Sequence, residues 1–202
     1  AVKAMFNHHA FRDSVRLSGV NSINWGRIVA QIVYYFTAAV SLGAPHRPVS
    51  FTVPTGNFGD IFAGYCAKRM GLPIEKLVIA TNSNDILRRT IDTGRYEMQG
   101  VAPTISPSMD IQISSNFERL LFESAGRDAN AVGRMMAALK QSRGFDLPDG
   151  AISAIRSEFA AGTANEAATS ETIAQTWANS SYLLDPHTAV GVSVARSLSG
   201  SA

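Results

Sequence analysis

Cysteine is almost absent from this chain of 202 residues, which contains only Cys66. A single cysteine cannot form a disulfide within the chain and has no partners for a zinc cluster. This usage is typical of proteins from a reducing compartment, so the sequence predicts a cytoplasmic location. His8, His9 and His46 also lack the spacing of metal ligands, and no metal site is predicted.

Long apolar runs and an excess of charge of one sign are lacking too. The longest apolar segment, Ile28 to Val40, is interrupted by Gln31 and Thr37 and is too short to cross a bilayer. The formal net charge is +2, and the basic residues are scattered along the chain. Nucleic-acid-binding surfaces concentrate such residues. We therefore expect neither a membrane nor a nucleic-acid partner.

The composition, 46% hydrophobic and 17% charged, is that of a globular chain that buries a core as one large domain or parts of two. The first residues have no signal-peptide pattern and resemble the middle of a helix. The last residues are small and follow a predicted helix. We expect a fragment that is truncated on both sides.

Strand-like and helix-like segments alternate in the first half. This order predicts an α/β fold with a doubly wound parallel sheet and right-handed crossovers. The expected strands are Leu17–Ile23, Val49–Val53 and Leu77–Thr81, and the expected helices begin near Asn24 and span Asp60–Met70 and Asn84–Thr93.

After Gly100 the pattern becomes helical, with strand character only at Tyr182–Leu184. The expected helices there are 114–126, 129–143, 149–162 and 170–177. We predict that residues 1–101 belong to a large α/β domain and that 102–178 form a helical insertion lobe. Residues 179–202 return to the large domain, with a last helix at Thr188–Leu198 packed on the sheet.

The loop between the second strand and its helix contains Gly56, Asn57, Phe58, Gly59 and Asp60. Two glycines around an asparagine let backbone N–H groups approach an anion, and the following helix adds its partially positive N-terminus. The pattern indicates a phosphate site. An ordinary strand-to-helix turn has the same local sequence, so the loop alone leaves both interpretations open.

Five motifs in order resemble threonine synthase, a pyridoxal 5'-phosphate (PLP) enzyme, over about residues 12–198. Within that family the chain resembles the longer form, for which the fourth motif is distinctive. The motifs are NSINWGRIVAQIVYYF at 21–36, VPTGNFGDIFAGYCAKRMGLP at 53–73, ATNSND at 80–85, SPSMDIQISSNFERLLFE at 106–123 and DPHTAVGV at 185–192.

The resemblance implies PLP-dependent fold type II and a lyase of threonine biosynthesis. Such an enzyme converts O-phospho-L-homoserine and water to L-threonine and phosphate. The cofactor phosphate is then expected at residues 56–60. The substrate phosphate is expected at Ser22 and Arg27, with the Asn57 amide as a third donor. An arginine in a first helical turn is disfavoured by the helix dipole, which supports an anion beside Arg27.

Other polar residues have simpler interpretations. Ser22 could be a turn residue, and Asn24 is better explained as an N-cap. Asp60 is an ordinary acid of a first helical turn and is included only weakly. For His187 a structural role is favoured over a proton shuttle, and Thr188 is expected to cap the last helix.

Lysine is scarce, with only Lys3, Lys68, Lys76 and Lys140. The family needs a lysine that holds the cofactor as a Schiff base, and none of these four stands in the family's lysine motif. That lysine is expected upstream of residue 1, and the anchor of the pyridine nitrogen downstream of residue 202. No catalytic residue is therefore assigned in this chain.

Three hypotheses follow. The first is the C-terminal part of a threonine synthase, inactive alone, whose partner is the N-terminal half of the same protein. The second is a related PLP-dependent phospholyase that eliminates phosphate without making threonine. The third is a non-catalytic phosphate-binding module.

Overall fold

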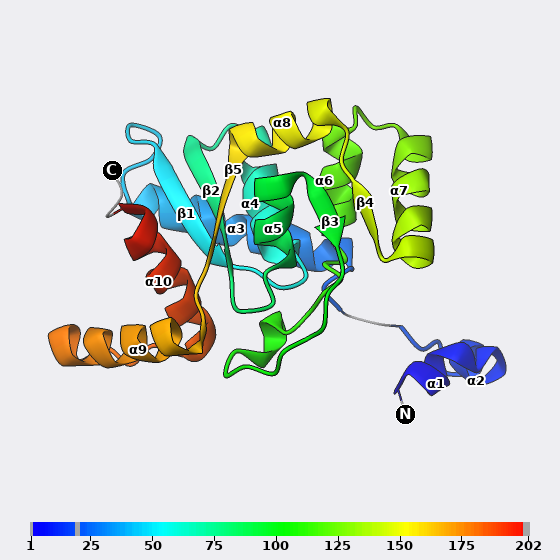
Figure 1. Cartoon of the computed structure of the whole chain (residues 1–202), viewed down its shortest axis with the longest axis horizontal. Coiled ribbons are helices and arrows are strands. Elements are labelled where there is room, and N and C mark those ends of the chain that lie inside the picture. The colour runs from blue at the N-terminus through cyan, green and yellow to red at the C-terminus, as the bar shows by residue number, and fades with distance from the viewer. Residues whose placement is uncertain (1, 19–20, 200–202) are drawn as a thin grey trace.

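A three-stranded parallel sheet forms the centre of the molecule. The computed structural model describes residues 2–18 and 21–199 (Figure 1). The sheet has the order β1-β2-β5, formed by β1 (Val49–Pro54), β2 (Ile74–Thr81) and β5 (Phe159–Thr163). Both pairings are parallel, with Thr52 opposite Val78 and Val78 opposite Ala160. The carboxyl ends of all three strands therefore meet at one edge, where open α/β folds bind ligands.

The two faces of the sheet are covered by different helices, because alternate residues of a strand point to opposite faces. On β2, Leu77 and Ile79 belong to the larger core, which contains residues of α3 (Trp25–Ser41), α4 (Gly59–Arg69), α5 (Ile86–Thr93) and α8 (Asp149–Glu158). Val78 and Ala80 belong to a smaller core with α10 (Pro186–Ser199). α9 (Glu166–Ser180) lies against α10 (Figure 1).

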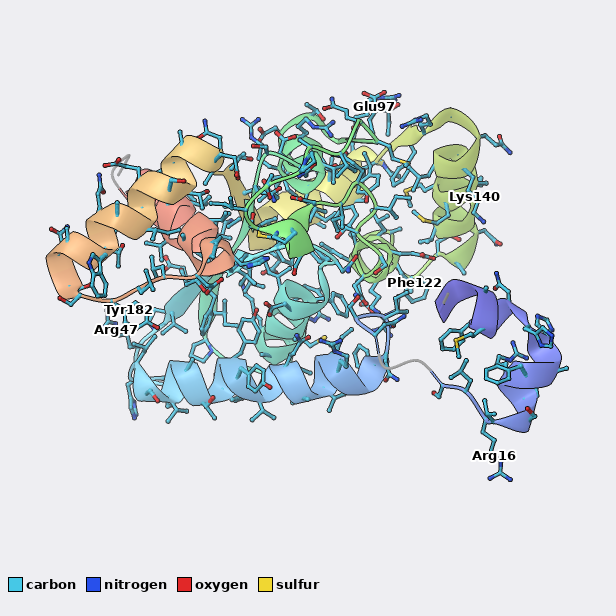
Figure 2. All side chains as sticks on the ribbon, turned by 90° about the horizontal axis from the view of Figure 1, so that it is seen from below. Arg16, Arg47, Glu97, Phe122, Lys140 and Tyr182 are labelled. Carbon is cyan, nitrogen blue, oxygen red and sulfur yellow. The ribbon has the colours of Figure 1, made fainter. Side chains whose placement is uncertain are left out.

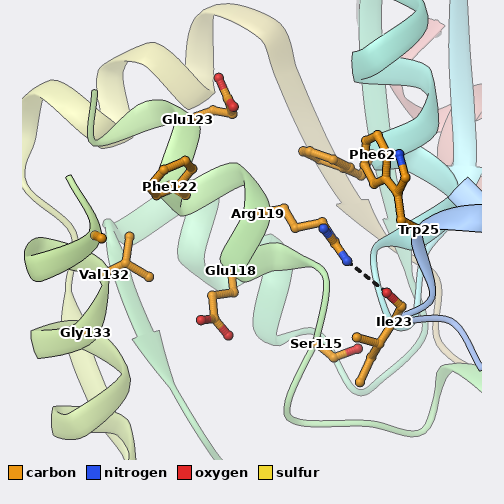
Figure 3. A pocket seen from close by; sticks show the side chains of 11 residues that line it. Ile23, Trp25, Phe62, Ser115, Glu118, Arg119, Phe122, Glu123, Val132 and Gly133 are labelled. Carbon is orange, nitrogen blue, oxygen red and sulfur yellow. Dashed lines mark hydrogen bonds between the residues drawn. The ribbon is translucent and has the colours of Figure 1, made fainter. Parts of the chain in front are cut away.

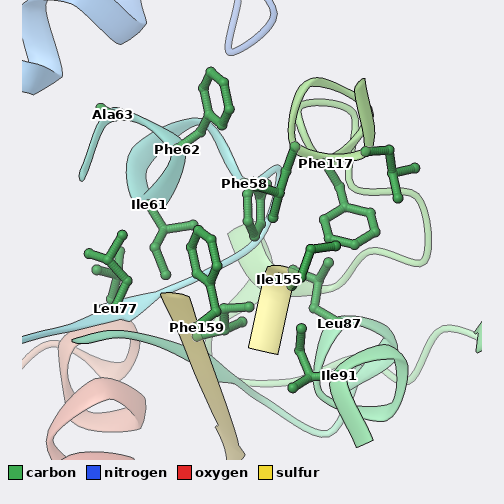
Figure 4. Close-up of a cluster of buried hydrophobic side chains, with 14 of the residues drawn as sticks. Phe58, Ile61, Phe62, Ala63, Leu77, Leu87, Ile91, Phe117, Ile155 and Phe159 are labelled. Atoms are coloured by element: carbon green, nitrogen blue, oxygen red, sulfur yellow. The ribbon is translucent and has the colours of Figure 1, made fainter. Parts of the chain in front are cut away.

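The larger core is centred on aromatic rings from three separate segments (Figure 4). The ring centroid of Phe58 lies 5.3 Å from that of Phe117 and 5.8 Å from that of Phe159. All three side chains are fully buried. The loop before α4 is thus attached to the core by its own phenylalanine.

A smaller unit of helices and a two-stranded sheet lies beside the central sheet. It contains α6 (Phe117–Ser124), α7 (Ala129–Ser142) and the antiparallel pair β3 (Arg95–Glu97) and β4 (Gly144–Asp146). Tyr96 of β3 stacks on Phe117 and Phe145 within this unit. The contact of Phe117 with Phe58 joins the unit to the larger core. A short 3-10 helix, η1 (Pro107–Met109), lies between β3 and α6 in the chain.

The first expected strand is wrong. Residues 17, 18 and 21–23 are not in a strand, while 19 and 20 lie outside the described residues. The side chain of Asn21 accepts a hydrogen bond from the N–H of Ile23, and the Asn21 carbonyl accepts one from the N–H of Asn24. Such local bonds favour a turn over a strand. The expected helix after Asn24 is confirmed, with Asn24 as its N-cap.

The expected helix at 149–162 is too long, since α8 ends at Glu158 and the next residues form β5. Gly162 packs against α10, because a Cβ there would lie 2.6 Å from Val194 Cγ1. Tyr182–Leu184 is not a strand. Residues 102–178 thus contain helices and also one strand of the central sheet, and the proposed division into domains stays a prediction.

The N-terminal helices α1 (Val2–Asn7) and α2 (His9–Ser14) stand apart from the sheet (Figure 1). α3 runs along one side of the molecule with side chains projecting outward (Figure 2), and Val29, Val33, Tyr34 and Val40 are exposed on it. Over the part of the chain that the structure describes, no helix combines the length and apolarity needed to span a membrane.

Candidate functional site: a cavity at the start of α4

The loop that joins β1 to α4 makes a sharp turn at the carboxyl edge of the sheet. The N–H of Thr55 donates to the carbonyl of Ala80, so the loop begins beside the end of β2. Phe58 has a φ of 66°, and this non-glycine residue supplies the left-handed conformation of the turn. Its ring lies in the core, so only the backbone of Phe58 can reach a ligand in the loop.

Both glycines of the loop lie against other segments. A Cβ at Gly56 would lie 2.7 Å from the carbonyl oxygen of Ser108, and a Cβ at Gly59 would lie 3.1 Å from Nδ2 of Asn116. Contacts below 3.0 Å to backbone cannot be relieved by a rotamer change, so position 56 requires glycine. The two glycines therefore permit close packing around the loop rather than unusual φ angles.

The first turn of α4 has no side-chain cap, because Phe58 precedes it. Asn24 caps α3, Asp128 caps α7 and Asn165 caps α9 through side-chain oxygens, whereas α5, α6 and α8 also lack such a cap. The first N–H groups of a helix need acceptors, and an anion can supply them. The start of α4 is thus left open on the side of the loop.

A cavity of about 260 Å³ lies at this open helix start. It contains all seven residues that the sequence predicted for the two phosphates. The residues that line it are Ser22, Arg27, Gln31, Pro54, Thr55, Gly56, Asn57, Phe58, Gly59, Asp60, Ser108, Met109 and His187. The structure thereby brings the start of α3 and the loop before α4 to one place.

Three polar side chains of this cavity have no partner among the described residues. The hydroxyl of Ser22, the guanidinium of Arg27 and the amide of Asn57 line the cavity and form no hydrogen bond or ion pair there. Together they offer several N–H and O–H donors and one positive charge. Such a set suits a phosphate, which accepts several hydrogen bonds and carries negative charge.

Asp60 lines the same cavity and carries the only carboxylate among its lining residues. Although Asp60 is exposed to the cavity, the protein around its carboxyl group desolvates it and raises its pKa, which a hydrogen bond from Tyr35 partly offsets. Tyr35 also donates to the Asp60 carbonyl at 3.0 Å. The side chain of Asp60 is therefore the weakest of the predicted cofactor contacts.

Sequence reasoning missed Gln31 and Ser108 as cavity residues and favoured a structural role for His187. Nε2 of His187 accepts the N–H of Ser108 at 3.3 Å, and its Nδ1 lies 3.4 Å from Oδ1 of Asp185. In this arrangement Nε2 is an acceptor and Nδ1 faces a carboxylate oxygen. The DPHTAVGV motif was the signal that could have placed His187 here.

Asp185, and not Thr188, caps the last helix, which corrects the expectation for Thr188. The carboxylate of Asp185 accepts the N–H groups of His187 and Thr188 and the Thr188 hydroxyl. These bonds, first among them that from the Thr188 hydroxyl, lower the pKa of Asp185.

No lysine with a described side chain lines the cavity. Lys68 pairs with Glu158, Lys76 donates to the carbonyls of Arg156 and Ser157, and Lys140 lies on the outer helix α7 (Figure 2).

A larger cavity of about 730 Å³ lies between α3, α4, α6 and α7 (Figure 3). Trp25, Phe62 and Phe122 line it together with Glu118 and Glu123. Its arginine, Arg119, already donates to Asn116 and to the carbonyl of Ile23. Two carboxylates and an occupied arginine disfavour an anion, so the smaller cavity is the candidate phosphate site.

Comparison with known proteins shows what the chain as a whole is similar to. No protein-family model matches the chain. The threonine synthase of Pseudomonas aeruginosa is 53% identical over 195 residues, which cover 96% of this chain and 42% of that protein. Over almost its whole length the chain is homologous to threonine synthases. It spans 42% of the length of this curated threonine synthase.

Solved threonine synthases have the same fold. The structure of the PLP-bound enzyme from Brucella melitensis has a TM-score of 0.95 and 67% identity, and it covers 97% of this chain and 42% of its own. The yeast threonine synthase has a TM-score of 0.90 and 44% identity over 98% of this chain and 42% of its own. The predicted α/β class, PLP-dependent fold type II, is therefore confirmed.

Proposed function

We propose that this chain is the phosphate-binding part of a threonine synthase, which converts O-phospho-L-homoserine and water to L-threonine and phosphate. The observation that carries the proposal is the set of unpartnered donors on Ser22, Arg27 and Asn57 in one cavity with the open start of α4. The similarity to a PLP-bound threonine synthase supports pyridoxal 5'-phosphate as the cofactor.

The cofactor phosphate is assigned to residues 56–60. The glycines let other segments pack closely on the loop, and the uncapped N–H groups of α4 are suitable donors for a dianion. Pyridoxal phosphate, when bound, supplies an electron sink for negative charge on the substrate carbons. Asp60 is assigned through its backbone, because a carboxylate beside a phosphate is repelled.

The substrate phosphate is assigned to Ser22 and Arg27, with Asn57 between the two phosphate positions. Arg27 provides a planar fork of N–H donors that matches phosphate oxygens. Its role is to bind and orient the phosphate that leaves. Ser22 and Asn57 add hydrogen bonds from uncharged donors. These bonds orient the phosphate group but retain the product phosphate less strongly than a second charged group would.

The reactive lysine is assigned to another part of the same protein, because no described lysine reaches the cavity. We therefore propose that the chain is inactive alone and that its partner is the remainder of the polypeptide. The single cysteine and the absence of a basic stripe favour a cytoplasmic enzyme without a nucleic-acid partner. A phospholyase and a non-catalytic module are the competing functions.

Product analysis of the complete enzyme tests the proposal. Purified protein is incubated with PLP and O-phospho-L-homoserine, and phosphate and amino acids are quantified separately. Equal amounts of phosphate and L-threonine are expected. Phosphate with a keto acid and no threonine would favour the phospholyase, and no phosphate release would favour the non-catalytic module.

A further inference from the structure

Asn116, at the start of α6, connects the two segments that line the candidate phosphate site. Its side chain is fully buried. Nδ2 donates to the carbonyl oxygen of Ser22 at 2.8 Å and to that of Asn57 at 3.1 Å. One amide group thus joins the turn before α3 to the loop before α4, two segments that pair in neither helix nor sheet.

Arg119, one turn further along α6, completes this connection. Its Nε donates to Oδ1 of Asn116 at 3.0 Å, which orients the amide so that Nδ2 faces the two carbonyls. Its terminal nitrogen donates to the carbonyl oxygen of Ile23 at 2.8 Å (Figure 3). The guanidinium also lies 5.4 Å from the ring centroid of Trp25. Two successive carbonyls before α3 are therefore bound by α6.

The two segments depend on Asn116 to different degrees. The loop before α4 has further bonds, because the backbone N–H of Asn116 donates to Asn57 at 3.0 Å and the Ser114 hydroxyl donates to Gly56 at 2.6 Å. The turn at Ser22 and Ile23 has only the bonds from Asn116 and Arg119 to other elements among those the structure shows. Loss of the amide should release the turn and leave the loop in place.

We propose that Asn116, oriented by Arg119, is a positioning residue that sets the substrate-phosphate donors Ser22 and Arg27 at a fixed place relative to the cofactor loop. This inference rests on the proposed function. Asn116 touches neither ligand position itself and acts through the backbone of Ser22 and Asn57. The position of α6 therefore determines the distance between the two proposed phosphate positions.

The test uses the complete enzyme with Asn116→Asp, which keeps the size of the side chain and the acceptor for Arg119. The new oxygen faces two carbonyls and cannot donate when ionised. We expect the KM for O-phospho-L-homoserine to rise about tenfold, as for one lost hydrogen bond in a buried site. The Kd for PLP, from fluorescence titration of apoenzyme, should change less than about threefold, since the backbone bonds of the loop persist. Amide exchange should accelerate in residues 22–27 and stay unchanged in 59–63.

The control is Asn130→Asp, the same chemical change at an exposed position of α7 whose side chain has no bond in the structure. It should leave the KM, the Kd and the exchange rates as they are. Equal increases in the KM and in the Kd for PLP in Asn116→Asp would overturn the inference, because they indicate general loss of structure. An Asn116→Asp enzyme with the same KM, Kd and exchange rates as Asn130→Asp would overturn the inference as well.

Arg119→Met provides a second variant in case Asn116→Asp does not fold. It removes the bond to Ile23 while keeping an unbranched side chain on the helix, and it should show the same split between the KM and the Kd. An Arg119→Met enzyme with an unchanged KM would contradict the inference. If the parent enzyme neither binds PLP nor turns over substrate, the proposed function is refuted instead. Amide exchange rates in residues 22–27 of the parent and of Asn116→Asp would still test the connection through Asn116.

Discussion

Arg27 and Asn57 line one cavity, although Arg27 stands in the first turn of α3 and Asn57 in the loop before α4. Neither side chain has a partner among the described residues. A charged group without a partner beside an uncapped helix start favours an anionic ligand.

Arg27→Ala in the complete enzyme should weaken binding of the substrate far more than binding of the cofactor, because it removes a charged guanidinium group from the substrate phosphate alone. We expect a loss of about 2 to 4 kcal/mol in transition-state stabilisation, measured as kcat/KM. Arg134→Ala on the exposed face of α7 is the matched control, since Arg134 also has no partner in the structure. An unchanged kcat/KM for Arg27→Ala would remove this residue from the site.

Gly56→Ala should weaken PLP binding at least tenfold, because its Cβ would lie 2.7 Å from the backbone oxygen of Ser108 and one of the two segments must move. Gly133→Ala is the control, since a Cβ there meets nothing within 4 Å. The Kd for PLP is measured by titration of the apoenzyme. Full affinity in a folded Gly56→Ala protein would mean that the cofactor phosphate binds elsewhere.

The chain expressed alone should make no threonine from O-phospho-L-homoserine. Incubation with PLP followed by borohydride should label it only at background level, because no described lysine lines the cavity. Mass spectrometry of peptides that contain the four lysines provides the measurement. Stoichiometric labelling of one lysine together with turnover would show that the chain holds a catalytic residue after all.

Asp110 should make the stability of the protein depend on pH in the acidic range. It accepts hydrogen bonds from Thr104, Asn82 and Asn84. Desolvation raises its pKa, but these bonds outweigh that effect and the net shift is downward. Because the folded-state pKa lies below the unfolded one, the contribution is present above about pH 4 and is lost as the pH falls through the folded value.

Asp110→Asn should therefore lower the urea midpoint of unfolding at pH 7, by an amount on the order of one hydrogen bond. Below about pH 5 the urea midpoint of the variant should decrease less steeply with falling pH than that of the parent protein. Asp149→Asn, a change at an exposed carboxylate without a side-chain bond in the structure, is the control. Parallel pH profiles for parent and Asp110→Asn would show that this carboxylate contributes nothing in its ionised form.

The local sequence determined the elements whose burial pattern is periodic. The start of the helix after Asn24 was predicted within a residue, and so were both ends of the strand at Val49 and of the helix that begins at Gly59. Apolar residues recur in these segments at the spacing of a helix or fill a short buried strand, and a cap or a turn residue marks their ends. The glycine-bearing loop was recognisable for the same reason, since its turn is local.

Tertiary structure alone decided the rest. Phe159–Thr163 is a strand because β2 offers it a row of backbone partners, and the small residues of that segment fit either a helix or a strand. Gln31, Ser108 and His187 reach the cavity from three elements that only the folded chain brings together. The two bonds of Asn116 likewise depend on where α6 lies. Periodicity describes the environment of one element, whereas a site depends on distances between elements, which packing of the whole core determines.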